Sequence, residues 1–252
     1  MIHSKQFKMK NVFIILLSSL LITNVLAQEQ KDTIVKKESK WSLGIYASPN
    51  YSYRRIYSDA SFRQYDVYYR NKNDIPDYGY GISAELKYII NKKITITTGL
   101  NFDLLKYKTG LLDTAYAYPD PYDLSHSVTY YNILKQIYSH TFLSIPTIFN
   151  YTLIKRRVSY FIGFGGSFSY LLKSKKINYN TVENRKFDDA VEQSSNQFLF
   201  FGIIQSGVNY HINNNIIISL YPQFKYSNPL TIYYELKEQL YSFNINIGIS
   251  FK

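Results

Sequence analysis

The sequence has no cysteine, which excludes a disulfide-stapled scaffold, a lipid anchor on an N-terminal cysteine and cysteine-based zinc sites. It has only 11 glycines and 7 prolines among 252 residues, too few for a collagen-like or low-complexity chain. Only 19% of the residues are charged and 46% are hydrophobic, which excludes a disordered tail. The one long apolar run, at 12–22, excludes a bundle of membrane helices, because each helix needs ~20 apolar residues.

The N-terminal segment has the pattern of a secretion signal. Three lysines and no acid precede the apolar run, and small side chains at Val25 and Ala27 follow it. A retained membrane anchor is the alternative, but the run is short for a spanning helix. We predict three parts: a signal peptide over 1–27, a charged periplasmic leader over 28–40, and an outer-membrane barrel domain over 41–252.

Alternating side chains dominate the rest of the sequence and predict β-strands. The end of the chain is the clearest case, since apolar residues occupy every second position: Tyr241, Phe243, Ile245, Ile247, Ile249 and Phe251. Weaker versions of this pattern recur upstream. Together they predict eight strands, at 41–53, 77–90, 94–107, 138–153, 158–172, 197–212, 215–227 and 240–251.

The connections between these strands alternate strictly between short and long. Short links occur at 91–93, 152–157 and 213–215, and long ones at 54–76, 108–137, 173–196 and 228–239. All short turns therefore lie at one end of an up-and-down arrangement, as in outer-membrane barrels. We predict an all-β fold, an eight-stranded antiparallel up-and-down transmembrane β-barrel.

The volume of the lumen decides which face of the strands points outward. Eight strands enclose a lumen that side chains just fill, and the bulky apolar sets exceed that space. The opposite face carries eight of the 11 glycines: Gly44, Gly79, Gly81, Gly99, Gly163, Gly165, Gly207 and Gly248. We therefore place the apolar face against lipid and the small residues inside. Pro146 and Pro222 fall within predicted strands, where we expect a bulge or a local distortion.

Three stretches resemble strands of a known family. The stretch Phe142–Tyr151 (FLSIPTIFNY) looks like a strand of the PorT-like outer-membrane β-barrel family of Bacteroidota. Tyr160–Leu172 and Asn244–Phe251 are similar to that family's fifth and last strands. The resemblance implies an outer-membrane barrel, and a few such relatives assist protein secretion. Ser144 stands where the family usually has an acid, so no role tied to that carboxylate is carried over.

Strand parity points a set of charged and amide side chains into the lumen. The predicted polar network consists of Glu85, Lys87, Asp103, Gln205 and Lys225, with Asn101 and Gln223 beside them. A translocation path is one interpretation. We favour a plug, because unpaired charges in a narrow, partly dry lumen are costly. In particular, we expect Asp103 and Lys225 to face the same network.

The long loops offer two further candidate sites. Lys173, Lys175 and Lys176 follow the fifth predicted strand, and are candidate contacts for lipopolysaccharide phosphates. Lysines that lie in water at the base of a loop, without a ligand, explain the pattern equally well. Tyrosine-rich segments at 57–69 and 116–131 suit a binding surface, or packing between loops.

Enzymatic, metal and nucleic-acid functions have little support in the sequence. His126-Ser127 and Ser139-His140 have the residues of a rim lipid-modifying site, but no acid follows at a diagnostic spacing. The histidines lack metal-ligand spacing, so we expect no metal and no cofactor. The excess of basic residues is dispersed among acids without a recognition motif, so we expect no nucleic-acid partner.

The predicted function is that of an outer-membrane barrel with a side-chain-filled lumen. It would act through its loops or turns as an envelope structural, binding or secretion-accessory protein. Its partners would be outer-membrane lipid, lipopolysaccharide and an envelope or secretion-system protein. The alternatives are a narrow channel for small solutes, a rim lipid-modifying enzyme and a soluble ligand-carrying barrel.

Overall fold

The computed structural model describes residues 39–59, 64–110, 112–119, 127–154, 156–180, 185–190, 197–233 and 236–252. The predicted signal peptide and nearly all of the leader lie outside the described residues. His126 does as well.

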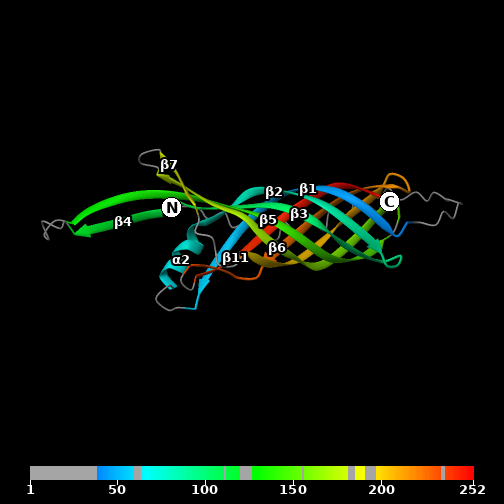
Figure 1. The fold of residues 1–252 in the computed structure, drawn as a ribbon, viewed down its shortest axis with the longest axis horizontal. Helices are drawn as coiled ribbons and strands as arrows, with labels where there is room; N and C mark the ends of the chain where they lie inside the picture. Colours follow the sequence, from blue (N-terminus) through cyan, green and yellow to red (C-terminus); the bar gives the residue numbers. More distant parts are fainter. Residues whose placement is uncertain are drawn as a thin grey trace.

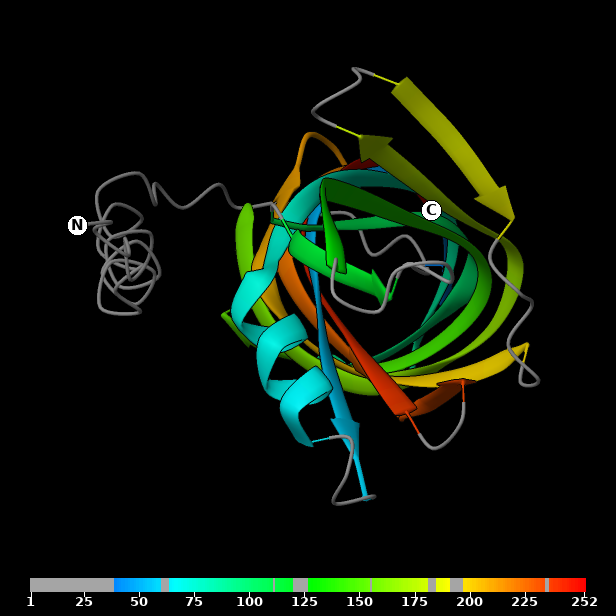
Figure 2. The same cartoon turned by 90° about the vertical axis from the view of Figure 1, so that its left-hand side faces the viewer.

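Eight long strands form a closed antiparallel ring, which confirms the predicted fold class (Figures 1 and 2). Each strand pairs with the next member of the ring, and the last one returns to pair with the first. The strands are β1 (Trp41–Ser58), β2 (Asp74–Ile89), β3 (Ile94–Thr109), β5 (Ser127–Ile154), β6 (Val158–Asn180), β8 (Phe198–His211), β9 (Ile216–Ser227) and β11 (Leu236–Phe251).

Three of the predicted long loops contain further strands. β4 (Leu112–Pro119) pairs with the start of β5, β7 (Arg185–Ala190) with the end of β6, and β10 (Leu230–Tyr233) with the start of β11. The β4–β5 hairpin projects far beyond the ring in Figure 1. Pairing within each hairpin satisfies backbone groups beyond the barrel wall. We call this the extended end, and the opposite one the short-turn end.

The fourth long link contains a helix that the sequence did not predict. Helix α2 (Gln64–Asn73) lies outside the ring, beside the outer part of β1 (Figure 2). Its Asn, Asp, Tyr and Val residues are mediocre helix formers, so local propensity gave little signal. No helix in the described residues is long and apolar enough to cross a membrane.

Asparagine side chains close two of the short turns. Asn91 Oδ1 accepts hydrogen bonds of 2.8 Å from the backbone N–H groups of Lys93 and Ile94. Asn213 Oδ1 does the same for Asn215 and Ile216, at 2.9 and 2.8 Å. These side chains take the place of backbone acceptors, which explains why links so short can reverse the chain.

The apolar face of the strands points outward. In β11, Ile247 is 51% exposed, whereas its neighbour Asn246 is 4% exposed. Phe243, Ile245 and Ile249 point outward with Ile247. This orientation is the one that hydrocarbon requires, and it is opposite to that of a soluble barrel with an apolar interior.

The two prolines interrupt pairing without shifting the register. Near Pro146, the pairs of β3 with β5 stop at Thr98–Thr147 and resume at Asn101–Ser144. Pro222 lies in a similar gap between β8 and β9. The expected local distortion is therefore present. The other expectation, a bulge at these prolines, is wrong, because the same number of residues is skipped on both strands. Each missing N–H removes a ladder bond while the alternation of faces continues.

Inward-facing glycines leave room for aromatic rings in the lumen. A Cβ atom on Gly248 would lie 2.3 Å from the Tyr46 ring, and one on Gly207 would lie 2.2 Å from Tyr221 Cβ. Neither distance is compatible with a side chain. The glycines and the two tyrosines therefore fill the same cross-section of the barrel.

Candidate functional site in the barrel lumen

Polar, apolar and aromatic layers fill the lumen from one end to the other. The layer nearest the short turns contains Tyr46, Phe161 and Tyr221, whose rings pack edge to face at centroid distances of 5.7 Å. Lys87 Nζ lies 2.5 Å from Tyr46 Oη and 3.7 Å from Glu85 Oε2. The Tyr221 hydroxyl donates to Glu85 Oε1 at 2.5 Å. The ion pair is thus held between two aromatic rings.

A chain of amide side chains crosses the middle of the lumen. Gln223 donates to Gln205, Gln205 to Asn150, and Asn150 to Thr97, at 2.8, 2.8 and 2.9 Å. These four residues come from four strands, β9, β8, β5 and β3. The chain therefore ties together opposite parts of the ring.

A buried ion pair lies between the amide chain and the extended end. Lys225 Nζ is 2.9 Å from Asp103 Oδ2, and the residues are 4% and 6% exposed. A cavity of only about 10 Å³ adjoins this pair, room for roughly one water molecule. Next follows an apolar layer of Leu105, Phe142, Leu171, Leu199, Phe201 and Leu240.

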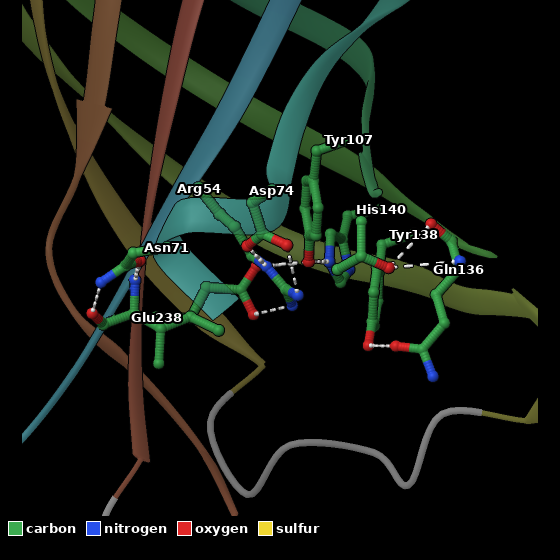
Figure 3. A network of polar contacts seen from close by, with 10 residues as sticks. Arg54, Asn71, Asp74, Tyr107, Gln136, Tyr138, His140 and Glu238 are labelled. Atoms are coloured by element: carbon green, nitrogen blue, oxygen red, sulfur yellow. Dashed lines mark hydrogen bonds and ion pairs between the residues drawn. The ribbon is translucent and has the colours of Figure 1, made fainter. Parts of the chain in front are cut away.

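An arginine at the centre of a second polar cluster closes the extended end (Figure 3). Arg54 is 1% exposed, and its Nε lies 2.6 Å from Asp74 Oδ2. Its guanidinium lies between two tyrosine rings, 4.6 Å from the centroid of Tyr107 and 4.2 Å from that of Tyr138. Glu238 Oε2 lies 3.8 Å from Arg54 Nη1. We call Arg54, Asp74, Tyr107, Tyr138, His140 and Glu238 the outer lock.

The outer lock lies at the edge of the apolar band. The residues that alternate with it on the outer surface are charged: Arg55 beside Arg54, and Lys106 and Lys108 beside Tyr107. At the same end, Lys237 and Asp59 form an exposed ion pair, and the hydrogen bond that Lys237 donates to Asp59 raises the pKa of Lys237. Water screens such a pair, whereas the lock is buried.

Helix α2 supports the lock from outside. The Asn71 side chain accepts from Ile56 N–H at 2.8 Å and donates to Ile56 C=O at 2.6 Å (Figure 3). The paired residues of β1 and β2 end at Ser52–Asp77, so Ile56 lies on an edge of β1 beyond that pairing. The carboxamide therefore replaces a strand partner close to Arg54.

A hydrogen-bond relay runs through the lock from Ser174 to Glu238. Tyr107 donates to Glu238, so the 2.6 Å contact between Tyr107 and His140 Nε2 requires the histidine to donate. His140 Nδ1 then accepts from the Ser174 hydroxyl at 2.9 Å. An acyl-transfer relay has its acid directly on the histidine, whereas Tyr107 lies between His140 and Glu238 here. Ser174 also lines neither the small cavity nor the larger one described below.

A bulge in β6 aims Ser174 into the lumen. Phe142 pairs with Leu171, whereas its neighbour Thr141 pairs with Lys173, so one extra residue is inserted in β6. The insertion reverses the faces of the following residues, as bulges do. Lys173 and Lys175 point outward, while Lys176 is on the same side as Ser174. The three candidate lipopolysaccharide contacts therefore do not share a face.

The structure places the predicted lumen residues on the inward face, in separate groups. Glu85 pairs with Lys87, Asp103 pairs with Lys225, and Gln205 belongs to the amide chain. Sequence reasoning missed the outer lock, because Arg54, Asp74 and Glu238 fell in predicted loops. The continued alternation of Tyr53, Arg55 and Tyr57 was the signal that β1 extends further.

The other sequence candidates are not assembled into a site. Ser139 points away from the lumen while His140 points into it, so that pair does not act together. In the part of the chain that the structure describes, no three His, Asp or Glu side chains are placed to hold a metal ion. The side chains of the tyrosine-rich segment 116–131 lie outside the described residues.

Known proteins that are similar to this chain include several outer-membrane proteins. No curated protein matches the chain significantly. Similar solved structures are OprG from Pseudomonas aeruginosa (11% identity, TM-score 0.44, covering 85% of this chain and 96% of that chain) and Neisserial surface protein A (13%, 0.38, 82% and 96%). Another is the outer membrane protease OmpT from Escherichia coli (9%, 0.41, 87% and 99%). The model of the family "Outer membrane protein beta-barrel domain" matches residues 26–235, and this chain therefore belongs to that family of outer-membrane barrels.

Proposed function

We propose that this protein is a closed outer-membrane barrel that acts through its loops and turns, as an envelope structural, binding or secretion-accessory protein. The observation that carries the proposal is the filled lumen. The outer lock, the apolar layer, the amide chain and the aromatic layer all lie within it. Eight-stranded barrels have no space for an aqueous path beside such layers.

Planar-bilayer recording of the purified barrel tests the closed lumen. We expect no resolved conductance steps in potassium chloride, because each fully buried Arg, Lys, Asp or Glu described in the lumen has a partner of opposite sign within 4 Å. A heat-denatured sample and a porin serve as the negative and positive controls. Reproducible single-channel steps from the folded protein would favour the narrow-channel alternative.

The finer role of a secretion accessory rests on the resemblance to PorT-like barrels of Bacteroidota. The stretch that carries it, Phe142–Tyr151, lies in β5, and Ser144 accepts a 2.7 Å hydrogen bond from Ser169 inside the lumen. A deletion strain tests this role. Loss of secreted proteins from the medium, restored by the gene, would support it, and unchanged secretion would leave the structural or binding role.

Lipopolysaccharide is the partner that we propose for the outer surface. Lys173 and Lys175 are exposed and point away from the lumen near the extended end. In outer-membrane barrels the end with the long loops faces the cell exterior. Cations at that height attract lipid phosphates. Lys176 points toward the lumen side, so we leave it out of the proposed contact. That the chain is not an enzyme stays a prediction.

A further inference from the structure

A polar cavity opens at the short-turn end, and residues of both the aromatic layer and the amide chain line it. It has a volume of about 100 Å³, enough for several water molecules. Phe161 and Tyr221 form part of its lining, and hydroxyl and amide side chains surround them. In outer-membrane barrels this end faces the periplasm. The closed lumen prevents passage further inward, so the cavity is a blind pocket.

Positive charge prevails around the cavity. Its described lining contains three lysines, Lys87, Lys92 and Lys252, and one acid, Glu85. Four more exposed cations lie on the described parts of the surrounding turns: Lys40, Lys93, Arg156 and Arg157. The described turn residues, at 90–93, 156–157 and 212–215, include no acid. An anion entering from the periplasm therefore meets a favourable field.

Two polar groups in the lining have unused hydrogen-bonding capacity. Lys87 has three N–H donors, of which Tyr46 and Glu85 account for two. Asn209 Oδ1 is a buried acceptor without a hydrogen-bond partner among the described residues. Lys87 can thus donate into the cavity, whereas Asn209 Oδ1 has almost no accessible surface and reaches the cavity only by a turn of its side chain. Each group is costly to leave unpaired.

We propose that this cavity binds a small polar molecule, or the side chain of a peptide, that carries one carboxylate and one N–H or O–H donor. The carboxylate accepts from Lys87, and the donor bonds to Asn209 Oδ1 after the Asn209 side chain turns toward the cavity. A carboxylate suits the site better than a phosphate, because Glu85, 3.7 Å from Lys87, repels a doubly charged anion more strongly than a singly charged one. Lys92, on a turn that lines the cavity, attracts the carboxylate at longer range.

The test uses matched probes on the full mature barrel in detergent micelles. N-acetylglycine supplies one carboxylate and one N–H donor, and N-acetylglycinamide is its neutral equivalent. A pentapeptide with a central glutamate, compared with its glutamine version, distinguishes a peptide source from a free small molecule. Binding is followed by the backbone amide NMR signals of Thr97, Asn150 and Asn209. We expect the carboxylate probes to bind at least ten-fold more tightly than the neutral ones.

Paired variants assign the binding to the cavity. The double variant E85Q/K87M removes the ion pair without leaving a lone buried charge, and is expected to reduce carboxylate binding to that of the neutral probe. D103N/K225M removes the matched pair that does not line the cavity, and is expected to bind as the unchanged protein does.

Two exposed lysines of one turn provide variants that do not threaten folding. Lys92→Met is expected to weaken binding about three-fold by loss of long-range attraction. Lys93→Met is its control and is expected to weaken binding less, because Lys93 does not line the cavity and lies over the Tyr151 ring on the outer surface, 5.9 Å from its centroid. Equal binding of charged and neutral probes, unchanged binding in E85Q/K87M, or phosphate binding as tight as that of the carboxylates would overturn the proposal.

Discussion

Replacing Arg54 with methionine is expected to lower the free energy of unfolding by about 3–5 kcal/mol, because it leaves Asp74 and Glu238 buried without their cation. The guanidinium also fills the space between the Tyr107 and Tyr138 rings, so its packing is lost as well. The measurement is urea unfolding in lipid vesicles, followed by the different electrophoretic mobility of folded and unfolded barrel.

The adjacent arginine provides the control for this substitution. Arg55 points outward and is exposed, so Arg55→Met is expected to change the free energy of unfolding by less than about 0.5 kcal/mol. The triple variant R54M/D74N/E238Q removes all three charges and is expected to regain part of the loss. Equal stability of R54M and R55M would show that the lock does not hold the extended end together.

Removing Lys225 is expected to have an effect of similar size in the middle of the lumen. Lys225→Met leaves Asp103 buried and unpaired, which is expected to cost about 3–5 kcal/mol of unfolding free energy. The double variant D103N/K225M is expected to be more stable than K225M, since no charge remains. A double-mutant cycle, completed with D103N, measures the coupling between the two residues.

This cycle distinguishes a plug from a path. In a water-filled path the two charges are screened, and the coupling between them is expected to fall below about 1 kcal/mol. In the closed lumen described above, the coupling is expected to be several times larger. Additive effects of the two single substitutions would contradict the closed lumen at this level.

The membrane-embedded part of the fold could be predicted closely from the sequence. The alternation in residues 241–251 has no exception, because lipid on one face and a narrow lumen on the other restrict every position. The short turns were also evident, since Asn91 and Asn213 are residues that close tight turns. Parity alone then placed Asp103 and Lys225 on the inward face.

The extended end could not be predicted in the same way. Beyond the apolar band both faces of a strand meet polar surroundings, so alternation fades although the backbone remains paired. The bulge in β6 has no marker residue, yet it decides that Ser174 and not Lys173 contacts the lumen. The ion pairs of Arg54 join residues 20 and 184 positions apart in the chain, which no local pattern reveals.

The central claim is that apolar side chains contact hydrocarbon while the lumen stays closed to lipid and filled by side chains. Quenching of tryptophan fluorescence by brominated lipids tests it most directly, in a Trp41→Phe background that removes the one native tryptophan. Ile247→Trp places the probe outside, and Phe161→Trp places it in the aromatic layer, where Phe161 is 7% exposed. The account predicts strong quenching of the tryptophan at position 247 and little at position 161. Stronger quenching at position 161 than at position 247 would contradict it.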